Sequence, residues 1–188
     1  MKKSYPLKNY IIFSFFLFMI FVLTGYLFAD LNYELANKYL EKIIEEFRHL
    51  IHPDPFKQFL VIFFHNAVAS FLMIITFFFF GLSALVSLFS NGIILGIIMN
   101  IFYEKIGLLA VAVLLVPHGI IELPAFFISA AVSLRLGIQW AKSISPHHSF
   151  KGEFPSAMKT FLKIILPMFL VAAFIESFIT PLIFKILK

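Results

Sequence analysis

Long apolar runs separated by short charged segments dominate this chain. A helix crosses a hydrocarbon core of about 30 Å with about 20 residues, and each run is at least that long. The pattern therefore predicts an all-α fold: a polytopic integral membrane helical bundle with about five spans. The runs are residues 10–29, 57–80, 82–103, 107–136 and 163–184.

The charged segment between the first two runs, residues 30–57, has the pattern of an amphipathic helix. Leu35, Tyr39, Ile43 and Phe47 recur every four residues, and opposite charges are also four residues apart. We expect this helix either to lie on the outer membrane interface or to pack against the bundle. Residues 1–56 would then form a first span plus an interfacial helix, and residues 57–188 a membrane core.

Two apolar regions contain residues that interrupt helices. Ser90-Asn91-Gly92 lies within the third run, and Pro117-His118-Gly119 lies within the fourth. The fourth run would be about 45 Å long as one straight helix, too long for a single span. We therefore expect a half-length segment over residues 107–116 before a span that begins near His118. Paired broken or re-entrant half-helices are typical of transporters.

Composition and charge narrow the class of protein. The chain is 61% hydrophobic and 13% charged, with a mean hydropathy of +0.98, which excludes a water-soluble enzyme or a nucleic-acid-binding domain. There are no cysteines, so disulfides and thiolate metal sites are excluded. Residues 135–159 form a predicted basic loop with one acid, Glu153. The positive-inside rule places this loop and the N-terminus in the cytoplasm, in a multi-pass protein of the cell membrane.

Two glutamates lie inside apolar runs, where ionisable groups are rare. Glu122 lies 13 residues before Arg135, and Glu176 lies 13 residues after Lys163. If both bases mark the inner interface, the two carboxyl groups reach the same depth, about 20 Å away. His118 is one helical turn before Glu122.

Such a group suits a divalent, zinc-like metal bound by His118, Glu122 and Glu176. A structural polar network and a proton relay are the alternatives. Three further polar residues, His65, Asn66 and Asn91, are expected to be buried and to hydrogen-bond between spans.

Small residues recur at four-residue spacing in two places. One row is Gly92 and Gly96; the other comprises Ala125, Ser129, Ser133 and Gly137. Such rows allow helix backbones to approach closely. They predict either packing within the chain or a homodimer interface.

Several stretches resemble the stage II sporulation protein M family. The specific ones are residues 117–125 (PHGIIELPA) and 172–181 (AAFIESFITP), with His65-Asn66 and Ser90-Asn91-Gly92 in support. The resemblance covers about residues 57–187. It implies a polytopic helical membrane protein, and the family's namesake resembles a scaffold that works with two peptidoglycan-degrading partners. The motif residues it singles out are Asn66, Asn91, His118, Glu122 and Glu176.

The leading functional hypothesis is a non-enzymatic scaffold in the lipid bilayer. It would form a homodimer, bind membrane or cell-envelope proteins, and not bind nucleic acid. A transporter or channel for an ion or small solute is the alternative, followed by an intramembrane metal-dependent hydrolase. An enzyme is disfavoured because the sequence contains neither a Ser/His/Asp arrangement nor the HExxH pattern.

Overall fold

The computed structural model describes residues 5–48, 51–145 and 149–182, with the side chains of residue 47 and residues 108–118 outside the description. Within these ranges the regular structure is entirely helical, and five stretches are long and apolar enough to span a membrane. This confirms the predicted all-α, polytopic bundle. The stretches are Leu7–Leu31, Pro55–Phe79, Leu82–Gly107, Gly119–Ser143 and Glu153–Leu182.

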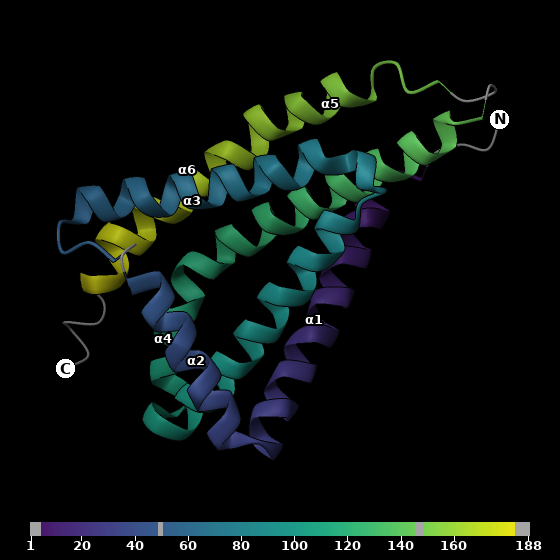
Figure 1. The fold of residues 1–188 in the computed structure, drawn as a ribbon. Helices are drawn as coiled ribbons and strands as arrows, with labels where there is room; N and C mark the ends of the chain where they lie inside the picture. Colours follow the sequence, from purple (N-terminus) through teal and green to yellow (C-terminus); the bar gives the residue numbers. More distant parts are fainter. Residues whose placement is uncertain (1–4, 49–50, 146–148, 183–188) are drawn as a thin grey trace.

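The spans run back and forth between two ends of the molecule (Figure 1). The start of α1, the turn between α3 and α4, and the connection from α4 to α5 share one end, whereas α2 lies toward the other. Helix α1 packs along the first half of α4, and α3 lies beside α6. The helices are α1 (Leu7–Leu31), α2 (Tyr33–Phe47), α3 (Pro55–Ile75), α4 (Leu82–Ser143), α5 (Glu153–Thr160) and α6 (Leu166–Phe174).

Helix α2 confirms the predicted amphipathic helix, and it packs against the bundle. Its buried residues are Ala36 and Leu40, which cluster with Ala29 of α1 and Ile97 of α4. The Lys105 ammonium donates a hydrogen bond to the side-chain amide oxygen (Oδ1) of Asn37 over 2.7 Å and thereby ties α4 to α2. Two apolar residues of the predicted row, Leu35 and Tyr39, remain exposed beside this contact.

The predicted break at Ser90-Asn91-Gly92 is wrong, because α4 continues through it as a helix. Gly92 serves packing instead, since a Cβ atom there would lie 2.7 Å from the Cβ of Phe21 in α1. The non-helical backbone within α4 is at Gly107 (φ 80°, ψ 166°), a conformation that glycine adopts easily. The fourth span includes Gly119–Ser143. Its predicted start near His118 and the re-entry of residues 107–116 stay predictions.

Glycines bring α1 and α4 into direct backbone contact. A Cβ atom on Gly96 would lie 2.1 Å from the Val22 carbonyl oxygen, and one on Gly25 would lie 2.3 Å from that of Ile93. The second small-residue row packs the second half of α4 against the turn after α3: a Cβ atom on Gly137 would lie 2.3 Å from the Gly81 nitrogen. Both rows therefore pack helices within the chain.

The predicted basic loop over residues 135–159 is too long. Helix α4 continues to Ser143 and α5 begins at Glu153, so the connection spans only residues 144–152. Leu136 and Gln139 are three residues apart and both buried, so α4 keeps a buried face beyond Arg135. Glu153 lies in the first turn of α5, where its negative charge interacts favourably with the positive end of the helix dipole. A cluster of four rings covers this end of the bundle: Phe77 contacts Trp140, Phe150 and Phe154, and Trp140 also contacts Phe150.

Candidate functional site

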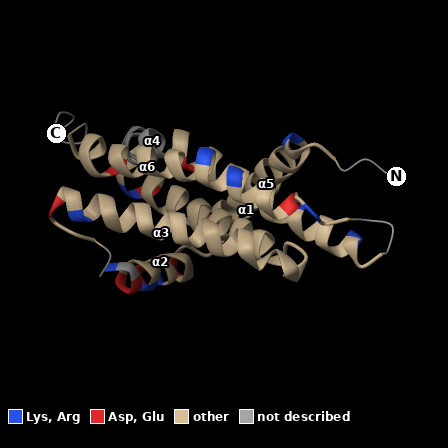
Figure 2. Ribbon diagram, turned by 90° about the horizontal axis from the view of Figure 1, so that it is seen from above, with Lys and Arg blue, Asp and Glu red and all other residues tan. Residues whose placement is uncertain are grey.

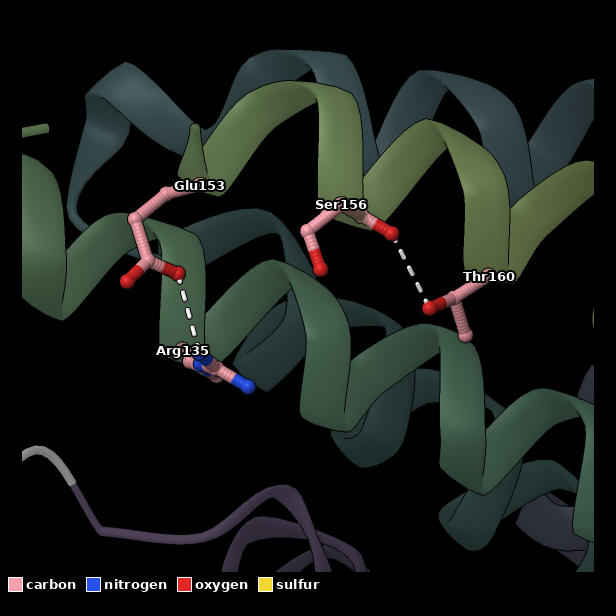
Figure 3. Close-up of polar contacts among 4 residues, drawn as sticks. All are labelled: Arg135, Glu153, Ser156 and Thr160. Carbon is pink, nitrogen blue, oxygen red and sulfur yellow. Dashed lines mark hydrogen bonds and ion pairs between the residues drawn. The ribbon is translucent and has the colours of Figure 1, made fainter. Parts of the chain in front are cut away.

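An ion pair between α4 and α5 forms the best-defined polar site in the described part of the chain (Figure 3). The Arg135 guanidinium contacts the Glu153 carboxylate over 3.0 Å, and the two side chains are 30% and 23% exposed. Arg135 lies more than two turns before the end of α4, so the pair is within the helical part of the bundle. It fixes the start of α5 against α4.

A small cavity adjoins this ion pair. Its volume is about 20 Å³, enough for one water molecule, and Ser156 and Thr160 of α5 line it together with Leu7 of α1. Thr160 donates a hydrogen bond to the Ser156 carbonyl oxygen over 3.1 Å. The buried Arg135 Nε atom has no hydrogen-bond partner. Three helices therefore meet at a site where one water could satisfy a buried donor.

Charged residues are distributed unequally between the two ends of the helical bundle. Figure 2 shows acidic and basic residues mixed along α2. At the other end the described charges are basic except for Glu153, which Arg135 already neutralises. These bases are Lys8, Arg135, Lys142, Lys151 and Lys159.

Glu122 and Glu176 lie in the half of the bundle opposite to the Arg135–Glu153 pair. Glu122 is half-buried near the start of the fourth span, and Glu176 is half-buried near the end of the fifth. These spans are antiparallel, and α4 contacts the turn that contains Glu176. That turn, Ile175–Ile179, is a π turn, a feature frequent at functional sites. Thr180, the residue after this turn, donates its hydroxyl hydrogen to the Ile175 carbonyl oxygen over 3.3 Å.

The proposed metal ligands cannot all be placed, because the His118 side chain lies outside the described residues. Among the described side chains, no group of three or more His, Asp or Glu residues could hold a metal ion. The set His118, Glu122 and Glu176 therefore stays a prediction.

Two of the three other polar residues expected to be buried are exposed on this chain. His65 and Asn91 point away from the bundle, and Asn66 is half-buried. Asn91 donates to the Ser87 carbonyl oxygen over 2.9 Å, so it hydrogen-bonds within its own helix instead of between spans. The exposure of both side chains describes this chain alone, so burial of the two residues between spans stays a prediction.

Comparison with known proteins decides the family. The family described as stage II sporulation protein M matches residues 14–181. The chain belongs to this family. The match begins in α1, so the first span is part of the family fold, although the motifs that suggested the family lie after residue 57.

An uncharacterized protein of Methanocaldococcus jannaschii is 32% identical over 124 residues, covering 62% of this chain and 67% of that protein. No solved structure matches the chain significantly. Membership of the family therefore agrees with the five-span membrane architecture.

Sequence inspection missed two buried polar features of this stage II sporulation protein M family member. Asn100 is 1% exposed, and neither atom of its amide has a hydrogen-bond partner. It lies one turn after Gly96, so the glycine contact with α1 could have indicated its burial. The Arg135–Glu153 pair was hidden because its members, 18 residues apart, were both assigned to a loop.

Proposed function

We propose that this family member is a non-enzymatic membrane scaffold that acts as a homodimer and binds membrane or cell-envelope proteins. The observation that carries the proposal is the backbone contact of α1 with α4 and of α4 with the turn after α3. Closely packed backbones cannot slide past one another without losing contacts along their whole length. They form a rigid frame, which suits a protein that holds partners in position.

The charge distribution supports a cytoplasmic N-terminus. The end that carries Lys8, Lys142 and Lys151 is basic, and the positive-inside rule assigns such an end to the cytoplasm. The connection between α4 and α5 then lies inside, and α2 lies at the outer interface. With α2 outside, partners in the cell envelope could reach the exposed Leu35 and Tyr39.

A flux assay distinguishes a scaffold from a transporter. Purified protein in proteoliposomes should show no flux of a panel of cations, anions and small neutral solutes above that of empty vesicles. A flux that Glu176→Gln abolishes, and that Glu104→Gln at an exposed position leaves unchanged, would overturn the scaffold. The unbroken helix at Ser90–Gly92 supports the expected result, because the transport hypothesis depended on two broken segments.

A metal at His118, Glu122 and Glu176 remains part of the proposal. Its support is that both glutamates lie in the same half of the bundle and that Glu176 lies in a π turn. Elemental analysis should find about one divalent ion per chain in the wild type and loss of it in His118→Ala, Glu122→Gln and Glu176→Gln. Glu104→Gln is the matched control and should keep the ion. Absence of metal from the wild type would instead favour a protonated polar network.

A further inference from the structure

The turn between α3 and α4, residues 76–81, is unusually apolar for a connection between two spans. Residues 58–103, which include this turn and most of the two helices that it joins, contain no Asp, Glu, Lys or Arg. The connection from α4 to α5 lies at the same end of the molecule and contains Ser145 and Lys151. Four large apolar side chains at the turn are nevertheless exposed: Phe78, Phe79, Phe80 and Leu82.

The backbone of this turn has a conformation that polar turn residues normally supply. Phe80 has φ 56° and ψ 27°, and Gly81 has φ 80° and ψ 11°, so both residues are left-handed. Glycine, asparagine and aspartate adopt this conformation at the lowest steric cost, whereas an aromatic residue in it is an outlier. An exposed phenylalanine at such a position indicates that the surroundings of the turn are apolar.

Hydroxyl groups of the protein satisfy carbonyl oxygens at the end of α3. The last carbonyls of a helix have no partner within the helix, and water often serves them. Here the Thr76 hydroxyl donates to the Leu72 carbonyl oxygen over 2.7 Å. The Met73 carbonyl oxygen accepts from Ser83 over 3.1 Å and from Ser133 over 2.7 Å. Irregular backbone at membrane depth needs such partners, because hydrocarbon offers no hydrogen bonds.

The turn also lies deeper in the bundle than the end of α4. Gly137 of α4 packs directly against Gly81, and α4 continues past this level to Ser143, about 9 Å farther along its axis (Figure 1). Between the two levels, Trp140 packs against Phe77. Tryptophan is enriched at membrane interfaces, so the turn lies on the hydrocarbon side of this ring.

We propose that the turn between α3 and α4 lies inside the bilayer and that its four exposed apolar side chains contact lipid acyl chains. Acyl chains require an apolar surface and a backbone with internal hydrogen-bond partners, and the turn has both. A water-borne protein partner fits less well, because protein interfaces have a polar rim and residues 58–103 contain no charged side chain from Asp, Glu, Lys or Arg. The inference goes beyond the scaffold function and depends neither on the homodimer nor on the orientation.

Single cysteines measure whether water reaches the turn. The chain has no cysteine, so Phe79→Cys, Leu82→Cys and Ser145→Cys each offer one thiol. In membrane fragments open on both sides, a membrane-impermeant maleimide should label both turn variants at least about tenfold more slowly than Ser145→Cys, because it reacts with the thiolate and hydrocarbon disfavours that charged form. After unfolding in detergent, all three should react at the same rate. Labelling of the turn variants as fast as Ser145→Cys in the membrane would overturn the proposal.

Fluorescence quenching then distinguishes lipid from protein as the neighbour of the turn. A bimane fluorophore attached to Phe79→Cys or Leu82→Cys is reconstituted in vesicles of phosphatidylcholine with brominated acyl chains. We expect these lipids to quench both fluorophores and to leave the matched fluorophore on Ser145→Cys largely unquenched. Slow labelling without quenching would show that a second copy of the chain covers the turn, and the contact with lipid would be refuted.

Discussion

Replacing Gly96 by alanine is the sharpest test of the packing between α1 and α4. The new Cβ atom would lie 2.1 Å from the Val22 carbonyl oxygen and 2.7 Å from the Tyr26 nitrogen, against 3.4–4 Å for an ordinary contact. Both neighbours are backbone atoms, so no side chain can rotate away. The helices must separate by about 1 Å, which loosens the contacts along the whole pair.

We expect Gly96→Ala to lower the free energy of unfolding by about 3 kcal/mol, at the upper end of the usual cost of overpacking. That corresponds to a roughly hundredfold change in the ratio of folded to unfolded protein. The assay is reversible unfolding of the purified protein in mixed detergent micelles, followed by circular dichroism.

The control for this experiment is the same substitution elsewhere in α4. A Cβ atom on Gly119 would meet only Leu123, at 3.9 Å, so Gly119→Ala should be neutral or up to about 1 kcal/mol more stable. If Gly96→Ala were as stable as Gly119→Ala, α1 would not cross α4 at this position, and the reasoning would be refuted.

Two further predictions concern polar contacts. Glu153→Gln leaves the partly buried Arg135 without its ion-pair partner and should cost about 1–3 kcal/mol of unfolding free energy, whereas Glu46→Gln, in the exposed pair on α2, should stay within about 0.5 kcal/mol. Equal effects in the same unfolding assay would mean that the α4–α5 ion pair adds nothing. Ser133 donates to a carbonyl of α3 over 2.7 Å, so Ser133→Ala should cost about 1 kcal/mol. Ser129→Ala removes a hydrogen bond within α4 and should cost less; the reverse order would contradict the interhelical role of Ser133.

The spans could be predicted from the sequence because hydrocarbon thickness sets their length directly. All five predicted runs overlap an observed span, and α2 has the predicted amphipathic pattern. Length and hydropathy are local properties, so a single sequence carries them. The family motifs added the relation to known proteins, which the match over residues 14–181 confirms.

Helix breaks and burial could not be predicted with the same success. A glycine in a helix can either interrupt the helix or allow a neighbouring helix to approach closely, and the sequence alone does not show whether a neighbour is present. Gly92 lies against α1, whereas Gly107 bends α4. Burial depends equally on neighbours that are distant in sequence. His65 is exposed while Asn100 is buried, although both are polar residues within apolar spans.

Labelling of single cysteines from each side of the membrane tests the proposed arrangement of spans most directly. Because the chain has no cysteine, Ser145→Cys, in the connection between α4 and α5, and Glu41→Cys, on α2, each offer one thiol. In intact cells a membrane-impermeant maleimide should label Glu41→Cys, and it should label Ser145→Cys only after the cells are opened. Labelling of both from the same side would contradict the arrangement of spans, and labelling of Ser145→Cys alone in intact cells would reverse the proposed orientation.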